Sequence, residues 1–262
     1  MNLQQVLSRL RGFCLNKGLR EVTVQHKKSI LAACEDPGTI STYTSQGLLW
    51  ALPQTGQMHL EHIMLDNPHD NGYFTITTSY RDEPNPEPGR HESVFIMFEF
   101  EIGGGIEELI KFEKDMLNDL GYTKINTLKY QSAQKVYNCI DIGSAEEKMI
   151  EKDFGTCVML KDFPLTSNPY WNMSGNDEYS NKIDVIMHGM ETIGSAERSC
   201  DPDYMMERFL TQSDGEYSKL LYDKFGEERV NQELEVYLNK KFFPRSGGGI
   251  GVSRLMRSLQ LK

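Results

Sequence analysis

Residue types that could bind a phosphate and a purine ring stand together in one segment of this 262-residue sequence. Residues 77–101, TTSYRDEPNPEPGRHESVFIMFEFE, contain two strand-like stretches around a loop rich in proline. Side chains two positions apart lie on one face of a strand. One face is therefore expected to carry a polar and aromatic set: Thr77, Ser79, Arg81, Glu83, Phe95, Met97, Glu99 and Glu101. The other face, which includes Phe98 and Phe100, is expected to join the core.

Arg81, Glu83 and Phe95 have the chemistry of a nucleotide site. A guanidinium holds a phosphate at two points because its donors form a planar fork. A phenylalanine ring can stack on adenine, and a carboxylate can accept a hydrogen bond from the exocyclic amine of that base. An amphipathic hairpin with a solvated charged face has the same pattern, so this segment alone leaves both interpretations open.

A second segment, residues 246–259, has the sequence SGGGIGVSRLMRSL. We expect its glycines, residues 247–251, to form a loop that leads into a helix at about Val252. Glycine lets the backbone approach a ligand closely, and the free amides at the start of a helix bind anions. Gly251 and Arg254 would then face one anion. The ordinary start of a helix is the alternative, and the segment matches neither a Walker A loop nor a Rossmann fingerprint.

The third segment, residues 179–201, is YSNKIDVIMHGMETIGSAERSCD. Asp184 and Glu191 lie across an expected strand and its turn, and Arg198 follows in the next strand or turn. Two carboxylates near a phosphate-binding arginine suit Mg²⁺, a hard cation that takes a few carboxylates together with phosphate oxygens. Surface acids in ordinary ion pairs are the alternative interpretation of this segment by itself.

Hydrophobic periodicity and capping residues predict the elements that must position these side chains. Helices are expected over residues 3–17, 106–120, 202–211 and 227–240, from about Val252, and from a capping box of Ser144 and Glu147. Strands are expected over residues 20–24, 73–79, 94–101 and 182–188. Their irregular spacing favours an α+β fold, a mostly antiparallel β-sheet flanked by helices, over a doubly wound parallel sheet. No linker divides residues 1–262, which are expected to form a single domain.

Composition narrows the classes of function. With 39% hydrophobic and 25% charged residues, the chain can bury a substantial core, and it has no apolar run long enough to span a membrane. A net charge of −10 argues against non-specific binding to DNA or RNA, which requires a basic surface. The first residues lack a leader pattern, and the five cysteines are widely spaced without a C-x-x-C pair. We therefore expect a cytoplasmic protein with free thiols.

Together and in this order, the three segments resemble the signature motifs of class II aminoacyl-tRNA synthetases of the aspartyl/asparaginyl branch. YRDE with the later GRH and F-x-x-x-E is similar to motif 2, and GGGIGVSRL is similar to motif 3. The stretch from FPLTSNPYWNM to GSAERSCD resembles the segment between them, and LPQTGQMHLE resembles the amino-acid-pocket segment before motif 2. The resemblance extends over about residues 5–262, and stand-alone paralogues related to archaeal asparagine synthetase are similar as well.

The resemblance implies roles in binding ATP for five residues. Arg81 would bind the α-phosphate and steady the attacked group. Glu83 and Phe95 would hold the adenine by a hydrogen bond and by stacking. Arg254 would hold the γ-phosphate, with help from His91.

The resemblance also implies a metal site and an amino-acid site. Asp184 and Glu191 would take Mg²⁺. Gln57 and Glu99 would hold the α-amino group of the substrate, and Arg198 would face its side chain. The expected ligands are therefore ATP, Mg²⁺ and an amino acid, and the expected assembly is a homodimer.

The sequence departs from the pattern of this branch at four positions. Gln25 stands where motif 1 ends in a proline at the dimer interface, and Val94 stands where a glutamate precedes the motif 2 phenylalanine. Leu60 replaces a lysine that aspartyl members use for the substrate carboxylate. Together with Glu99 in place of an aspartate, this makes the amino-acid pocket more asparaginyl.

Members of this branch also carry an anticodon-binding barrel before the core, whereas this sequence starts almost at motif 1. We therefore expect no anticodon-binding domain. The expected activity is that of an AMP-forming amide ligase, related to asparagine synthetase, which passes the acyl group to ammonia or a small amine. A minimal asparaginyl-type core that acylates tRNA and a catalytically inactive regulatory paralogue are the alternatives.

Overall fold

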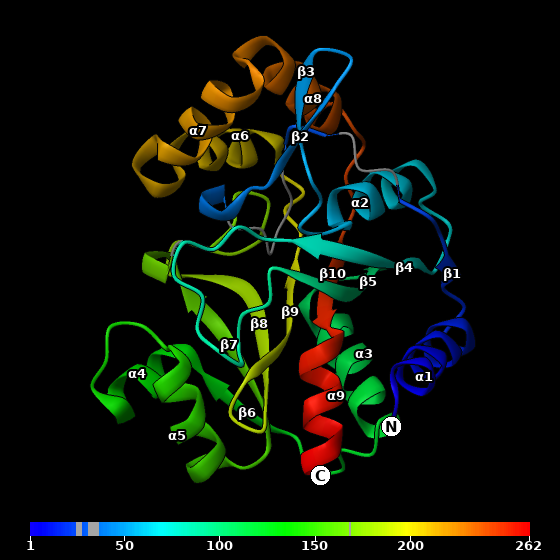
Figure 1. Cartoon of the computed structure of the whole chain (residues 1–262), viewed down its shortest axis with the longest axis vertical. Helices are drawn as coiled ribbons and strands as arrows, with labels where there is room; N and C mark the ends of the chain where they lie inside the picture. Colours follow the sequence, from blue (N-terminus) through cyan, green and yellow to red (C-terminus); the bar gives the residue numbers. More distant parts are fainter. Residues whose placement is uncertain (25–27, 31–36, 168) are drawn as a thin grey trace.

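An eight-stranded sheet forms the centre of the computed structural model, which describes residues 1–24, 28–30, 37–167 and 169–262 (Figure 1). Its strands run in the order β1-β4-β5-β10-β9-β8-β7-β6. They are β1 (Arg20–Glu21), β4 (Gly72–Tyr80), β5 (Val94–Gly103), β6 (Asn126–Lys129), β7 (Cys157–Pro164), β8 (Tyr179–Met187), β9 (Glu191–Glu197) and β10 (Arg245–Gly251). A separate hairpin pairs β2 (Thr42–Ser45) with β3 (Leu48–Ala51).

Helices of the described residues surround this sheet. They are α1 (Leu3–Asn16), α2 (Gln57–Asp66), α3 (Ile106–Asp119), α4 (Tyr130–Tyr137), α5 (Ser144–Phe154), α6 (Pro202–Thr211), α7 (Glu216–Phe225), α8 (Glu227–Leu238) and α9 (Val252–Leu261). Short 3-10 turns are η1 (Pro37–Thr39), η2 (Leu165–Ser167) and η3 (Gln212–Gly215). The first turns of α3, α5 and α8 each carry two glutamates, which complement the positive end of the helix dipole.

Neighbouring strands of the large sheet pair antiparallel, except β1 with β4 and β6 with β7 at its two edges. This arrangement confirms the predicted α+β fold. The last strand of the sequence, β10, lies in the middle of the sheet between β5 and β9. The three chemically interesting segments of the sequence therefore meet on adjacent strands.

One face of the sheet is covered by α1, α3 and α9, which build the main core. Phe98 and Phe100 of β5 point to this face, as the alternation of the strand predicts, and belong to one cluster with Leu109, Met116 and Leu255. Burial of each such side chain contributes about 1.5–3 kcal/mol. The main core therefore holds β5 in place and, by the alternation of the strand, turns its polar side chains to the opposite face.

The opposite face is covered at its two ends. α2 packs on β4 and β5, whereas α4 and α5 pack on β7 through an apolar cluster that includes Leu160 and Ile186. Figure 1 shows α6, α7 and α8 gathered with the β2–β3 hairpin beyond the sheet, where Trp171 and Phe209 belong to a further core. Between these covered ends, a cavity lies over β5, β10, β9 and β8.

The glycine run does not form the loop that we expected from the sequence. It is the central strand β10, in which residues 247–250 pair with β5 on one side and with β9 on the other. Its backbone groups are therefore used by the sheet rather than offered to an anion. Glycine inside a strand often marks a close approach of another group, as described below. The following helix begins at Val252, as predicted.

The predicted capping box of α5 is wrong by one residue. The Glu146 carboxylate accepts a hydrogen bond from the N–H of the N-cap residue, Gly143. Glu147 instead binds Arg90. The predicted elements begin and end within three residues of their expected bounds. The largest differences are the strand expected over residues 20–24, which ends at Glu21, and the strand expected from residue 182, which begins at Tyr179. The elements α2, α4, α7, β6, β7, β9, β10 and the β2–β3 hairpin were not predicted.

The sequence also led to expectations about membrane spans, about the cysteines and about Gln25. Across the described ranges, no helix is both long enough and apolar enough to cross a membrane. The cysteines that the structure describes, Cys14, Cys139, Cys157 and Cys200, are free thiols, as predicted. Gln25, at the position of the motif 1 proline, lies outside the described residues.

Candidate active site

The floor of the candidate site is a row of residues in register across four strands. Gly249 of β10 pairs with Glu99 of β5 and with Gly194 of β9, and Gly194 pairs with Asp184 of β8. Residues directly opposite each other in an antiparallel sheet share a face. Two glycines between two acidic residues therefore leave a hollow over the middle of the sheet.

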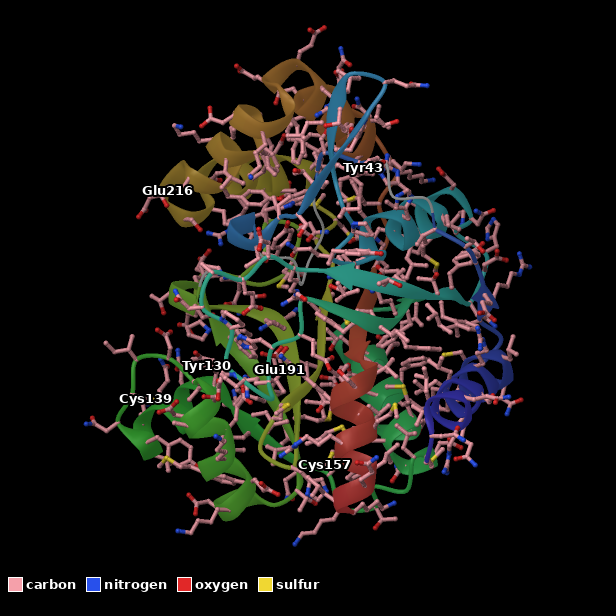
Figure 2. All side chains as sticks on the ribbon, in the orientation of Figure 1. Tyr43, Tyr130, Cys139, Cys157, Glu191 and Glu216 are labelled. Atoms are coloured by element: carbon pink, nitrogen blue, oxygen red, sulfur yellow. The ribbon has the colours of Figure 1, made fainter. Side chains whose placement is uncertain are left out.

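This hollow is a cavity of about 240 Å³. Gly249 leaves room for the Met97 side chain there, since a Cβ at this position would lie 2.6 Å from Met97 Cε. Residues that the sequence analysis singled out line this cavity: Arg81, Glu83, His91, Phe95, Asp184, Glu191, Gly251 and Arg254. Figure 2 shows Glu191 in the middle of the molecule, beside β8 and β9. The tertiary structure thus brings three distant segments around one cavity.

Arg81 and Phe95 lie together on one side of the cavity. Arg81 Cζ is 5.5 Å from the centre of the Phe95 ring, and the Arg81 N–H donates to the Ser93 carbonyl, which joins the two ends of the loop. On the same cavity, His91 Nδ1 lies 2.5 Å from Glu83 Oε2. An aromatic ring, a guanidinium and a carboxylate suit the base and phosphate of a purine nucleotide.

Arg254 reaches the cavity from α9. Its Nη1 donates to the Glu191 carbonyl at 2.9 Å and lies 3.8 Å from the Glu191 carboxylate, while its Nη2 is 3.5 Å from the Arg90 carbonyl. Arg90 donates to Glu147 through two hydrogen bonds of 2.8 and 2.7 Å. Glu147 also accepts from the Glu191 N–H at 2.9 Å. This nearly buried bidentate pair attaches the loop of residues 82–93 to α5 and β9.

Asp184 and Glu191, the predicted Mg²⁺ ligands, both line the cavity. Burial raises the pKa of Asp184 to about 7 against the opposing Lys182 ammonium, and the Glu191 carboxylate raises it further. Mg²⁺ binds through one or two carboxylates and completes its shell with water and phosphate oxygens. This pair therefore fits the ion as part of a nucleotide site. In the part of the chain that the structure describes, no group of three or more His, Cys, Asp and Glu side chains could hold a metal.

Gln57 and Glu99, predicted to hold the substrate amino group, are fully buried beside the cavity and do not belong to its lining. The Glu99 carboxylate accepts hydrogen bonds from three neutral donors: the Thr55 and Thr77 hydroxyls and the Gly56 N–H. Burial raises the pKa of Glu99, and these hydrogen bonds oppose that shift. Because Glu99 lies in register with the glycine floor, it adjoins the cavity.

Arg198 belongs to a buried ionic cluster formed by Glu61, Glu101, Arg198 and Arg245. The cluster lies at the ends of β5, β9 and β10 that are remote from α9. Arg198 Nη2 donates to Gln57 Oε1 at 2.6 Å and lies 3.4 Å from Glu101, and Arg198 Nε is 3.5 Å from Glu61. Arg245 Nη2 is 2.8 Å from Glu61. All four side chains of the cluster have no exposed surface, and their formal charges balance.

The pKa values of the two acids of this cluster shift in opposite directions. Although burial opposes ionisation, the Arg198 and Arg245 guanidiniums hold the pKa of Glu61 below its ordinary value. Burial raises the pKa of Glu101 to about 7. The Tyr237 hydroxyl donates to Glu61 at 2.5 Å, so Glu61 is the carboxylate around which the cluster is organised.

Leu60 does not line the cavity. It is fully buried on α2 in an apolar cluster with Met64 and Tyr73. Leu60 therefore does not contact a ligand in the cavity. It can affect the choice of substrate only because it lacks the charge of the lysine that aspartyl members have at this position.

Three charged residues that line the cavity, Arg90, Glu92 and Lys182, were not predicted from the sequence, and neither was Glu147, which pairs with Arg90. Lys182 lines the cavity two positions before Asp184, so strand alternation could have placed both on one face. Arg90 and Glu147 are an ion pair between elements far apart in the sequence, and no local pattern indicates their pairing.

Fold and site together define a catalytic core of the class II synthetase type, as the sequence motifs indicated. The chain belongs to the family of class II tRNA synthetases (D, K and N), whose model matches residues 30–261. The human cytoplasmic aspartate–tRNA ligase is 30% identical over 123 residues, 44% of this chain and 22% of that protein. The aspartate–tRNA(Asp/Asn) ligase of Methanospirillum hungatei is 27% identical over 125 residues, 45% of this chain and 25% of that protein.

Solved structures of the same fold cover nearly all of this chain. The asparaginyl-tRNA synthetase of Pyrococcus horikoshii, complexed with asparaginyl-adenylate, matches 98% of this chain and 64% of its own, with a TM-score of 0.80 and 18% identity. The asparaginyl-tRNA synthetase of Entamoeba histolytica, also in complex with asparaginyl-adenylate, matches 99% of this chain and 63% of its own, with a TM-score of 0.77 and 18% identity. This chain thus spans at most about a quarter of the curated relatives and less than two thirds of these solved chains.

Proposed function

We propose that this chain activates an amino acid with ATP, forming an aminoacyl-adenylate and releasing pyrophosphate. The observation that carries this proposal is that Arg81, Phe95, Glu191 and Arg254 line one cavity although they come from three separate segments. Membership of the family supports it. The asparaginyl-adenylate bound by the Pyrococcus horikoshii structure, which shares this fold, supports it as well.

In the proposed reaction the adenine stacks on Phe95 and donates to Glu83, Arg81 contacts the α-phosphate, and Arg254 holds the γ-phosphate with His91 nearby. The substrate carboxylate attacks the α-phosphorus in line. The new oxygen–phosphorus bond forms as the bond to the β-phosphate oxygen breaks, and pyrophosphate leaves. No covalent protein nucleophile is needed, because positioning and preorganised charge carry the catalysis. Mg²⁺ at Asp184 and Glu191 would neutralise part of the phosphate charge.

The proposed substrate is an aspartate- or asparagine-like amino acid. Gln57 and Glu99 would hold its α-ammonium where Glu99 adjoins the floor of the cavity. The pairing of Arg198 within the buried ionic cluster favours a neutral side chain, because Arg198 already lies close to Glu61 and Glu101. A substrate carboxylate would have to compete with these two glutamates for Arg198, and a buried charge left without a partner costs several kcal/mol.

The proposed acceptor of the acyl group is ammonia or a small amine. The amine nitrogen would attack the acyl carbon, lose a proton and displace AMP, which gives an amide. The net charge of −10 supports a small acceptor over a polyanionic one. We further propose that the chain works as a cytoplasmic homodimer.

Pyrophosphate exchange with ATP, Mg²⁺ and a panel of amino acids tests the activation step. Exchange with at least one amino acid is expected, and its absence with every amino acid would sink the proposal. Arg81→Ala should lower exchange by roughly 100-fold or more, because it removes charge aimed at the reacting phosphate. Arg20→Ala is the matched control, since Arg20 is an exposed arginine of β1 that pairs with Asp70.

A second candidate function, acylation of tRNA, is favoured by the relatives, which are tRNA ligases by name. A measurement of AMP formation with each acceptor distinguishes the two functions. AMP formation that depends on ammonia or an amine supports the amide ligase, whereas AMP formation that depends on tRNA supports the second candidate.

A further inference from the structure

Lys182 is a charged residue of the cavity to which the proposed reaction assigns no role. It lies on the same face of β8 as Asp184, and its Nζ is 2.8 Å from Asp184 Oδ2. The same Nζ is 4.0 Å from the centre of the Phe163 ring. An ammonium this close to an aromatic face is stabilised there. Lys182 is therefore held in place both by a carboxylate and by a ring.

The position of Lys182 affects any metal ion that uses Asp184. A carboxylate that already has an ammonium partner is a weaker ligand for a second cation, because the two cations repel each other at short distance. The other carboxylate, Glu191, also faces a cation, since Arg254 Nη1 lies 3.8 Å away. The two proposed metal ligands are thus each opposed by a cation of the protein itself.

We propose that Lys182 is a built-in cation of the nucleotide site. It weakens the binding of divalent metal ions at Asp184 and adds a fixed positive charge of its own beside the proposed phosphate positions. This inference rests on the proposed function, because it takes the cavity to be the ATP site. Lys182 is then a positioning residue: its charge sets the metal affinity of Asp184, and its contribution to folding does not.

The affinity of the nucleotide-free protein for Mn²⁺ measures the competition between Lys182 and the metal ion directly. Electron paramagnetic resonance gives this affinity, because it detects the Mn²⁺ that remains free. Lys182→Met keeps the length of the side chain over Phe163 but removes its charge. We expect Mn²⁺ affinity to rise by at least roughly tenfold, since a unit charge about 4 Å from a cation has a large effect even at an effective dielectric of 20. Lys111→Met is the matched control, because Lys111 forms an exposed pair with Asp115 on α3 and should leave the affinity unchanged.

Two further variants separate charge from packing. Lys182→Arg retains the charge and should keep the weak Mn²⁺ affinity of the original protein. Asp184→Asn combined with Lys182→Met should remove the gain, since the gain depends on the Asp184 carboxylate. Unchanged or weaker Mn²⁺ binding in Lys182→Met, or a gain that persists in the double variant, would overturn the proposal.

Binding of a fluorescent ATP analogue to the same proteins keeps this inference separate from the proposed function. If neither the original protein nor any of the variants binds the analogue, the proposed function fails. If the analogue binds but Lys182→Met leaves Mn²⁺ affinity unchanged, only the built-in cation fails.

Discussion

The cavity and the buried ionic cluster use arginine and glutamate in opposite ways at two ends of the same strands. In the cluster, Arg198 and Arg245 have no exposed surface, and each lies within 4 Å of two glutamate carboxylates. In the cavity, Arg254 is 26% exposed, and its shortest contact is to the backbone carbonyl of Glu191. The guanidiniums of the cluster are paired with carboxyl groups of the protein, whereas the guanidinium of Arg254 can still pair with a phosphate.

The difference follows from solvation. An unpaired charge in the interior costs several kcal/mol, so each cluster residue needs its partner even without a ligand. A partly exposed guanidinium is solvated by water, which a phosphate can replace. Changes to the cluster should therefore appear first in stability, and changes to the cavity first in activity.

The largest effect is expected in the cluster. Arg245→Met should lower the free energy of unfolding by about 3–5 kcal/mol, because it leaves Glu61 buried with one guanidinium instead of two. Urea unfolding at pH 7 measures this loss. Arg11→Met is the control, because it breaks an exposed pair with Glu21 and should cost less than about 1 kcal/mol. Equal losses in both variants would show that burial does not distinguish the two pairs.

The same substitution at the other end of β10 should act on activity. Arg254→Met is expected to lower pyrophosphate exchange by roughly 100- to 1000-fold, because it removes the guanidinium aimed at the triphosphate. The free energy of unfolding should change by less than about 1 kcal/mol, as for other partly exposed charges. Exchange assays and urea unfolding of Arg254→Met and Arg245→Met, run side by side, test the contrast. A large loss of stability in Arg254→Met would contradict the expected difference between the cavity and the cluster.

A buried acid outside the cluster shows what the arginines do for Glu61. Glu113 on α3 is fully buried, and no basic side chain of the described residues forms an ion pair with it. Burial raises the pKa of Glu113 to about 8, whereas the unfolded chain has the ordinary value of 4.5. The folded state therefore binds more protons between these values, and stability falls as the pH rises through this window.

The Glu113→Gln variant should remove this dependence. Between pH 6 and pH 8, the original protein should lose about 2–3 kcal/mol more of its free energy of unfolding than the variant loses. Urea unfolding at several pH values gives both slopes. Acids with raised pKa values that lie away from Glu113, such as Glu101, contribute to both proteins alike. Identical slopes would mean that Glu113 is not protonated in the folded state.

The smallest effects are expected at two neighbouring glycines of β10 that face opposite sides of the sheet. A Cβ at Gly248 would lie 2.5 Å from Ser195 Cβ and 2.8 Å from the Gly194 carbonyl, so Gly248→Ala should cost about 1–3 kcal/mol. At Gly249, the nearest atom is the mobile end of Met97, so Gly249→Ala should cost less than about 1 kcal/mol. Thermal unfolding compares the two. A greater loss in Gly249→Ala would contradict the expected packing.

Local patterns in the sequence predicted much of the fold and of the candidate site. The alternation in residues 94–101 correctly placed Phe98 and Phe100 in the core and Phe95 on the cavity side. This succeeds because the two-residue period of a strand is a local property of the backbone. Apolar stripes and capping residues located α3 and α6 for the same reason.

Local sequence patterns did not predict strand β10 and helix α2. A run of glycines has no side chains to show a period, so residues 247–251 did not reveal that they form the central strand. Helix α2 buries polar residues, Gln57 and Glu61, together with apolar ones, so it shows no amphipathic stripe. Both elements depend on partners that are distant in the sequence.

By itself, the sequence determined which residue types surround the proposed nucleotide site, on which face of β5 Phe95 stands, and to which family the motifs belong. Only the tertiary structure decided the pairings between distant residues: Arg90 with Glu147, and Arg198 with Glu61 and Glu101. The physical reason is that register and helix packing bring these charges together across long stretches of chain. Whether a charge is then balanced within the protein or kept for a ligand depends on how deeply that packing buries it.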